Sequence, residues 1–438
     1  MATRYWLGAA VAIPEQIEFE VDGDWDTGDT VWIEINGKRL TATLGTDLTN
    51  DNVCDIIANM INGDAALGDE TRSALGSTIG EFVGLTATVP STNYTGTGVT
   101  ACTFTLTGPA NGRPIGTVTV GETASGTSSG GFTRPTTNDI AAESPNHWDV
   151  VDNWSAGTKP VNGDTVIFDH QAAASCLYDL TQTSLTVASF KVTNGFGFSI
   201  GLPEINKDNS SYPYDEHQPT YLALAAATVL DIDSSGGGIV KIDCASTDTT
   251  TTVRGSGATA ETNVPPVLLK INNASADLYV LGGSVGVGFE PGTAGELATY
   301  TCGGTSNPSL TLGDTMTLAT GTVTSGKVVS NSAITTLTLE GGEHEQRSGA
   351  LTTLSVNGGT YWDMSGSTIT TVNMNGGRYD HTKDNRTTTI TNFNVYSKCS
   401  IKDPAGAITA SNGFDIYPSL KEITLEFPKR KTYTISAI

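Results

Sequence analysis

The pattern of apolar and polar positions is most regular between Ile334 and Tyr396, where one short phrase occurs four times. The copies begin at Ile334, Leu351, Ile369 and Ile390, so successive starts are 17 to 21 residues apart. Within each copy, apolar residues alternate with Thr, Ser or Asn, which is typical of a β-strand with one buried face. A repeat of this length is too short for a pair of helices and indicates one turn of a β-solenoid.

Three of the four copies end in a Gly-Gly pair, at 341–342, 358–359 and 376–377. Glycine adopts positive φ without strain, so these pairs predict corners where the chain leaves one strand and enters the next. One turn cannot be stable alone. Its three inward side chains contribute roughly 2 kcal/mol each, whereas ordering each residue costs on the order of 1–2 kcal/mol. The turns must therefore stack into a stiff rod with a surface rich in Thr and Asn.

Residues 14–122 show a different pattern and predict a small α+β domain. Apolar residues alternate over Ile17–Val21 and over Val31–Ile35, and Asn36-Gly37 is a strong signal for a hairpin turn.

One helix is predicted in this domain, because apolar residues recur at helical spacing from Val53 to Ile61. Thr49 or Asn50 is suited to cap its start, and Gly63 to end it.

The rest of the chain divides at composition changes. Residues 123–146 are rich in Gly, Ser and Thr and predict a linker or strap. Residues 147–169 carry Trp148 and Trp154, which we expect to plug the open end of the solenoid, because a terminal turn otherwise exposes its core. The coils are expected over 185–400, and terminal strands with a basic tip, Lys429-Arg430-Lys431, over 401–438.

Charge and composition narrow the function. The net charge of −23 argues against a nucleic-acid partner. No run of eighteen apolar residues is present, so we expect no membrane-spanning helix. The six cysteines and five histidines are scattered without metal-ligand spacing. We therefore expect free buried thiols and neither a metal nor a cofactor, although the even cysteine count leaves disulfides open.

Residues 1–13 predict an extended arm whose Tyr5 and Trp6 attach to another surface. Arg4 and the short apolar run after it only weakly imitate a signal peptide, so we expect none. Secretion, as for a bacterial surface adhesin, is the alternative.

The order of these segments resembles a group of tailed-phage virion structural proteins. In them a small α+β module, here "GDTVWIEINGKRLTATLG" to "FTLTGPANGRPIGTVTV", precedes a Trp-marked opening, here "HWDVVDNWSAGTKPVNGDTVIFD", and a right-handed β-helix. The resemblance implies a mainly β chain that serves as a capsid decoration, fibre or tail appendage in a virion. It implies contacts with major capsid or tail proteins and homotrimers. It supplies no set of catalytic residues.

Aligning the repeats gives one candidate binding site. Stacking places His344, Tyr361 and Tyr379 in one column, with Trp362 and Asp380 in a second and Asp363 in a third. Aromatic rings beside carboxylates suit a face that binds a host surface glycan or a partner. An aromatic ladder with a polar rim is the simpler interpretation.

A polysaccharide-cleaving tailspike is the remaining alternative for this site. It would need two carboxylates that face one glycosidic bond, and sequence alignment alone does not supply that geometry. We therefore predict a non-enzymatic structural protein and assign no catalytic residue.

Overall fold

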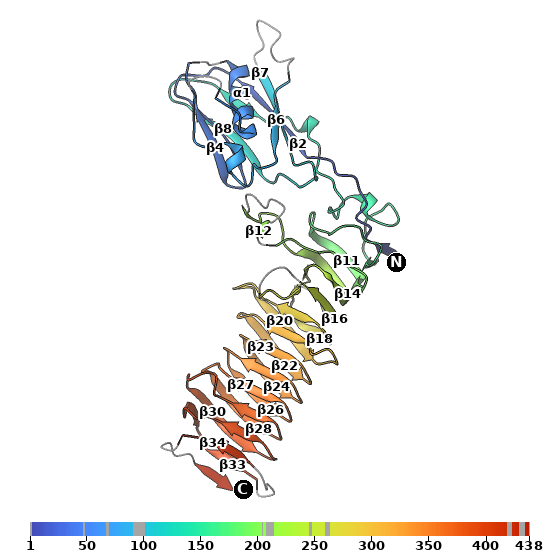
Figure 1. Ribbon diagram of the computed structural model, residues 1–438, viewed down its shortest axis with the longest axis vertical. Coiled ribbons are helices and arrows are strands. Elements are labelled where there is room, and N and C mark those ends of the chain that lie inside the picture. The colour runs from blue at the N-terminus through green and yellow to red at the C-terminus, as the bar shows by residue number, and fades with distance from the viewer. Residues whose placement is uncertain are drawn as a thin grey trace.

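The structure is a computed structural model that describes residues 2–46, 49–66, 70–90, 101–203, 205–206, 214–244, 248–258, 263–417, 423–428 and 434–437. The chain is mainly β, as predicted, with 48% of residues in strands and 6% in helices. A parallel β-solenoid of about 11 turns begins near residue 165 and is preceded by a small domain with one helix. Figure 1 shows the small domain at one end and the solenoid extending away from it. The basic tip expected at Lys429–Lys431 lies outside the described residues.

Most turns contribute one strand to each of two stacked rows, and neighbours within a row pair in parallel. The first row contains β11 (Thr181–Val192), β14 (Leu222–Gly237), β16 (Thr250–Ala258), β18 (Asn272–Val280), β20 (Gly295–Cys302), β22 (Met316–Val323), β24 (Ala333–Leu339), β26 (Leu351–Val356), β28 (Thr368–Met374) and β30 (Thr388–Val395). The second row contains β15 (Val240–Asp243), β17 (Val267–Lys270), β19 (Ser284–Val287), β21 (Ser309–Leu312), β23 (Lys327–Ser330), β25 (Glu343–Gln346), β27 (Thr360–Asp363), β29 (Arg378–Asp380), β31 (Ser400–Lys402) and β34 (Thr424–Glu426).

Three short strands near the C-terminus also stack on the solenoid. Both β32 (Ile408–Ala410) and β33 (Phe414–Ile416) stack on β30, and β35 (Ile435–Ala437) stacks on β33. A hairpin of β12 (Ile205–Asn206) and β13 (Tyr214–Asp215) leaves the solenoid toward the small domain (Figure 1).

The repeated phrase produces the predicted register. Ile334 pairs with Leu351, Leu351 with Ile369, and Ile369 with Ile390. These four side chains and the two inward residues that follow in each copy are at most 2% exposed. Each turn therefore places its apolar residues directly on those of the turn before it, which supplies the burial that one turn lacks.

The Gly-Gly corners also form as predicted. Gly342, Gly359 and Gly377 have φ of 67°, 68° and 60°. A Cβ at Gly359 would lie 2.4 Å from the Gly342 carbonyl oxygen, and one at Gly377 would lie 2.7 Å from that of Gly359. Glycine is needed at these corners both for the backbone conformation and for the close approach of successive turns.

The N-terminal arm is part of the solenoid, which corrects the expectation that it docks elsewhere. Strand β1 (Thr3–Tyr5) pairs in parallel with β10 (Thr165–Phe168) and adds a first turn. Trp6 has no exposed surface and packs in the plug formed by Trp148, Trp154 and Phe168. A fully buried ring cannot attach the protein to another surface, and of the two predicted attachment residues only Tyr5 remains half-buried.

The small domain has two sheets around one core. The first contains β6 (Thr86–Thr88), β7 (Ala101–Thr107), β2 (Gln16–Asp22) and β9 (Gly131–Thr133), and the second contains β5 (Thr71–Arg72), β4 (Lys38–Thr43), β3 (Thr30–Ile35) and β8 (Val118–Thr123). The hairpin turn has positive φ at Asn36 (49°) and Gly37 (81°), as predicted. Because β9 pairs with β2, the domain extends to residue 133 rather than 122.

Helix α1 (Asn50–Asn62) confirms the predicted helix and both of its boundaries. The Thr49 side chain accepts a hydrogen bond from the Asn52 amide, and Gly63 ends the helix with φ of 76°.

The small domain is inserted into the solenoid rather than joined by a single linker. The arm leaves β1, and the chain returns at Glu143 beside it, with antiparallel bridges between Ile13 and Glu143 and between Gln16 and Ile140. Four backbone hydrogen bonds of 2.8 to 3.0 Å close these bridges. The strap expected over 123–146 is thus one side of a paired stem, which restricts how the domain moves relative to the rod.

Candidate functional site

The structure confirms the predicted columns but places them on opposite sides of the strand. His344 pairs with Tyr361 and Tyr361 with Tyr379, and Trp362 pairs with Asp380. Five of the six predicted site residues have no exposed surface, and the sixth, Trp362, is half-buried. The buried five are His344, Tyr361, Asp363, Tyr379 and Asp380. The expected single glycan-binding face is therefore absent, because side chains alternate along a strand and the aromatic column points inward.

The inward column is an aromatic ladder along the solenoid axis. The His344 ring stacks on Tyr361 with centroids 5.7 Å apart and planes 5° apart, and the ring centroids of Tyr361 and Tyr379 are 5.4 Å apart. The Tyr379 hydroxyl donates a 2.5 Å hydrogen bond to Asp363 Oδ2. Burial lowers the pKa of His344 to about 4 and raises the pKa of Tyr361 and Tyr379. These rings are neutral at pH 7 and form part of the core.

The outward row consists of Glu345, Trp362 and Asp380, one residue from each of three successive turns. Glu345 is at the centre of its charged contacts. Its carboxylate is bound by Lys383 at 2.7 Å, Lys327 at 2.9 Å and Arg347 at 3.1 Å. Burial alone would raise the pKa of Glu345, but these three cations lower it to about 2. The cations come from separate turns or from the residue after a strand, so the repeat alignment gave no signal for them.

Trp362 lies next in this row and is covered by two cations. The Lys383 ammonium lies 3.8 Å from the ring centroid and the Arg378 guanidinium carbon 5.3 Å. Such contacts contribute about 0.5–1 kcal/mol each at exposed sites. Arg378 also forms an ion pair with Asp380, which explains how this outward carboxylate is covered.

A groove of about 340 Å³ lies beside this row. It is lined by Phe289, Pro291, Thr311, Gly313, Asp314, Asn331 and Ser348. Thr311, which lines the groove, lies two turns before Glu345 in the same outward column, because Thr311 pairs with Val329 and Val329 with Glu345.

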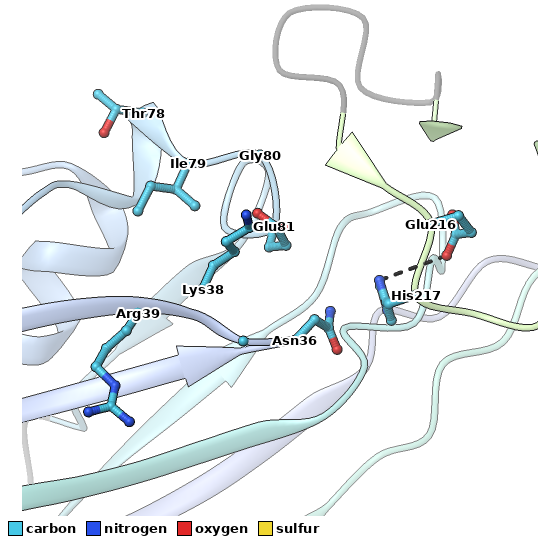
Figure 2. Close-up of a pocket in the computed structure, with 10 residues that line it drawn as sticks. Asn36, Lys38, Arg39, Thr78, Ile79, Gly80, Glu81, Glu216 and His217 are labelled. Carbon is cyan, nitrogen blue, oxygen red and sulfur yellow. Dashed lines mark ion pairs between the residues drawn. The ribbon is translucent and has the colours of Figure 1, made fainter. Parts of the chain in front are cut away.

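A larger cleft of about 820 Å³ separates the small domain from the solenoid (Figure 2). Its walls are the hairpin turn at 36–39, the segment 78–81, and Glu216 with His217 from the solenoid side. Sequence reasoning missed this cleft, because its walls are far apart in the chain and no motif links them.

His217 projects into the junction beside this cleft. A Cβ at Gly116 would lie 2.5 Å from both His217 Nε2 and Asn36 Oδ1, so the ring is in close contact with the backbone of the small domain. Burial and the nearby charge of Arg113 lower the pKa of His217 to about 4. Glu216 Oε1 lies 3.8 Å from His217 Nδ1.

His147 links the same two bodies on the stem side. Its Nδ1 lies 3.0 Å from Asp179 Oδ2 in the solenoid, and its Nε2 lies 2.8 Å from the Gly112 carbonyl oxygen in the small domain. Burial lowers the pKa of His147, but the Asp179 carboxylate and the Gly112 carbonyl outweigh it and raise the pKa above its usual value.

The described residues contain no cluster of three or more His, Cys, Asp or Glu side chains suited to a metal ion. All six cysteines are buried free thiols. Burial raises the pKa of Cys399 to about 11 and those of Cys244 and Cys302 to about 12, so these three are protonated at pH 7. None of the described helices has the length and apolar character needed to span a bilayer.

These features define the class of the protein as an elongated parallel β-solenoid that carries an inserted α+β domain on a paired stem. Comparisons of the chain with profiles of protein families, with curated proteins and with solved structures found no match.

Proposed function

We propose that the protein is a non-enzymatic structural component of a phage-like virion, namely a capsid decoration, fibre or tail appendage. The observation that carries the proposal is the insertion of the small domain at one end of a stiff rod. The paired stem and the His147 contact hold that domain at the end of the rod, which suits it to attach the rod to a particle. The order of segments, which resembles tailed-phage virion proteins, supports the same function.

The surface of the first strand row supports assembly into a homotrimer. Two outward columns run from β22 to β28 without a charged residue, although the chain carries a net charge of −23. They consist of Thr320, Thr336, Thr353 and Thr371, and of Thr322, Thr338, Ser355 and Asn373. Copies that meet through this surface avoid most of the mutual repulsion of acidic chains.

Localisation tests the proposal. Antibodies raised against the full chain should label purified virions in electron micrographs, at a constant number of copies per particle. Labelling confined to the bacterial cell surface or the culture medium would instead support the adhesin alternative. Incubation with capsular polysaccharides should release no reducing ends, since we propose no catalysis.

Multi-angle light scattering of the purified chain tests the oligomeric state. A trimer has three times the mass of the chain, and replacing Thr336 and Thr353 by Glu should reduce it to monomers through charge repulsion. A monomeric wild-type protein would remove the trimer from the proposal.

Glycan binding is the second candidate function, and the Trp362 row favours it. A half-buried indole, three cations around Glu345 and an adjoining groove could hold a carboxylate-bearing sugar chain. Calorimetry with uronic-acid oligosaccharides should detect binding that Trp362→Ala weakens at least tenfold. Tyr279→Ala, at an exposed tyrosine of the other strand row, is the matched control. No binding, or equal binding by Trp362→Ala, would exclude this candidate.

A further inference from the structure

Among the residues that the structure describes, the loop 108–117 of the small domain meets a histidine at each of two points. His147 contacts Gly112 on the stem side. His217 contacts Gly116 beside the cleft, where it follows the β12–β13 hairpin of the solenoid (Figure 2). The loop is closely fitted at both points, because a Cβ at Gly112 would lie 2.0 Å from the Glu143 carbonyl oxygen.

The stem-side contact favours a charged ring. Both nitrogens of His147 face acceptors, so the doubly protonated ring donates two hydrogen bonds where the neutral ring donates one. The surrounding charges are acidic: Asp179 from the solenoid, and Glu143 and Glu15 from the two sides of the stem. Acidification below neutral pH therefore leaves this contact intact.

The cleft-side contact favours a neutral ring. His217 is partly buried and lies near Arg113 of the same loop. Its polar neighbours also include Glu216, with Oε1 3.8 Å from Nδ1, and Gln218, with Nε2 3.1 Å from the ring Nε2. The charged residues that line the cleft next to His217 are Lys38, Arg39 and the buried Glu81, besides Glu216. A proton added to His217 thus places a second positive charge beside Arg113 in a desolvated contact.

We propose that this junction is a pH-operated hinge, in which acidification breaks the His217 contact and the small domain swings about the His147 contact. Opening widens the cleft while the stem keeps the two bodies joined. The lowered pKa of His217 means that acid favours the open form. The ring has a pKa near its usual value of 6.5 when it is released, but near 4 when it is docked, so the open form takes up the proton first. Acidification through this window shifts the ratio of open to closed molecules by on the order of 10²-fold.

Small-angle X-ray scattering of the full chain between pH 7.5 and pH 4 tests the hinge, with far-UV circular dichroism to confirm that the strands persist. The wild-type radius of gyration should increase as the pH falls toward 4. His217→Gln, which cannot gain a proton, should keep the neutral-pH radius throughout. His217→Lys should show the larger radius already at pH 7.5. His170→Gln, at a histidine with a 79% exposed side chain outside the junction, should behave as wild type.

Three outcomes would overturn the proposal: a wild-type radius that does not change, the same increase in His217→Gln, or a folded His217→Lys chain that stays compact at pH 7.5. If His217→Lys does not fold, Gly116→Ala replaces it, since its Cβ would displace the His217 ring at any pH. A folded Gly116→Ala chain with the wild-type radius at pH 7.5 would also refute the hinge. The His344→Phe background removes the acid-sensitive histidine of the solenoid core from the comparison.

Discussion

At the residue scale, the direction in which a side chain points decides what it can do. His344 and Glu345 are neighbours in β25, yet one stacks inside the solenoid and the other gathers three cations on its surface. The core histidine must stay neutral, and the surface carboxylate must stay charged. Their pKa values are accordingly displaced downward for opposite reasons, burial for His344 and cations for Glu345.

His344 should make the solenoid sensitive to acid. Above pH 6.5 neither the folded nor the unfolded chain protonates it, but between pH 6.5 and 4 only the unfolded chain does. The free energy of unfolding therefore falls with falling pH across this window, by roughly 3 kcal/mol in total. His344→Phe keeps the stack and should flatten this limb in urea unfolding measured at each pH. If the free energy of unfolding of His344→Phe fell with pH as steeply as that of wild type or of His170→Gln, His344 would not be the source of the acid sensitivity.

The sequence was sufficient for the stacking of the repeats but not for the location of a site. Periodicity alone predicts that Ile334, Leu351 and Ile369 lie on one another, because each strand repeats the one before it. It could not predict which side of β25 faces outward, since both alternating sets contain polar and aromatic residues. Nor could it predict that Lys383 reaches Glu345, 38 positions away, because side chains from different turns meet only after stacking.

At the element scale, the solenoid depends on its corners and its plug. The corners bring successive backbones closer than a side chain allows. The plug covers the first turn with Trp6, Trp148 and Trp154, so that the apolar column is not exposed there. Both are local features on which the stability of all later turns depends.

Gly359→Ala should destabilise the solenoid by several kcal/mol, because its Cβ would lie 2.4 Å from the Gly342 carbonyl oxygen. Gly292→Ala is the matched control: its φ of 74° is similarly positive, but no atom lies within 4 Å of the added carbon. It should cost only about 1 kcal/mol. Guanidinium unfolding measures both, and equal losses would show that conformation alone, without the close approach, explains the corners.

Trp6→Ala should cost about 3–5 kcal/mol, the usual loss for removing a buried aromatic ring. Val11→Ala, in the same arm but 79% exposed, should change the free energy of unfolding by less than about 0.5 kcal/mol. If Trp6→Ala were as stable as Val11→Ala, the arm would not be part of the plug.

At the scale of the whole molecule, the solenoid is modular and the small domain is not. Each turn contacts mainly the turns before and after it, and each adds about 4.8 Å to the rod. The small domain, in contrast, depends on the stem, the loop at 108–117 and the solenoid side chains that meet it.

Deleting residues 351–368 removes one complete repeat and should leave a folded, shorter rod, because Ile369 then takes the place of Leu351 above Ile334. Deleting residues 351–359 removes only part of a turn and breaks the register, so that chain should lose its cooperative unfolding transition. Circular dichroism and thermal unfolding compare the two. A folded second variant, or an unfolded first one, would argue against independent turns.

The pairing of β1 with β10 also constrains the order of events during synthesis on the ribosome. Thr3 cannot pair until Thr165 has been synthesised, 162 positions later. At a synthesis rate of about 5–20 residues per second, this delay lasts roughly 8–30 seconds. During that interval Trp6 has no partner, while the whole inserted domain emerges and can fold. The nascent arm is therefore a hydrophobic segment that a chaperone could bind until β1 pairs with β10.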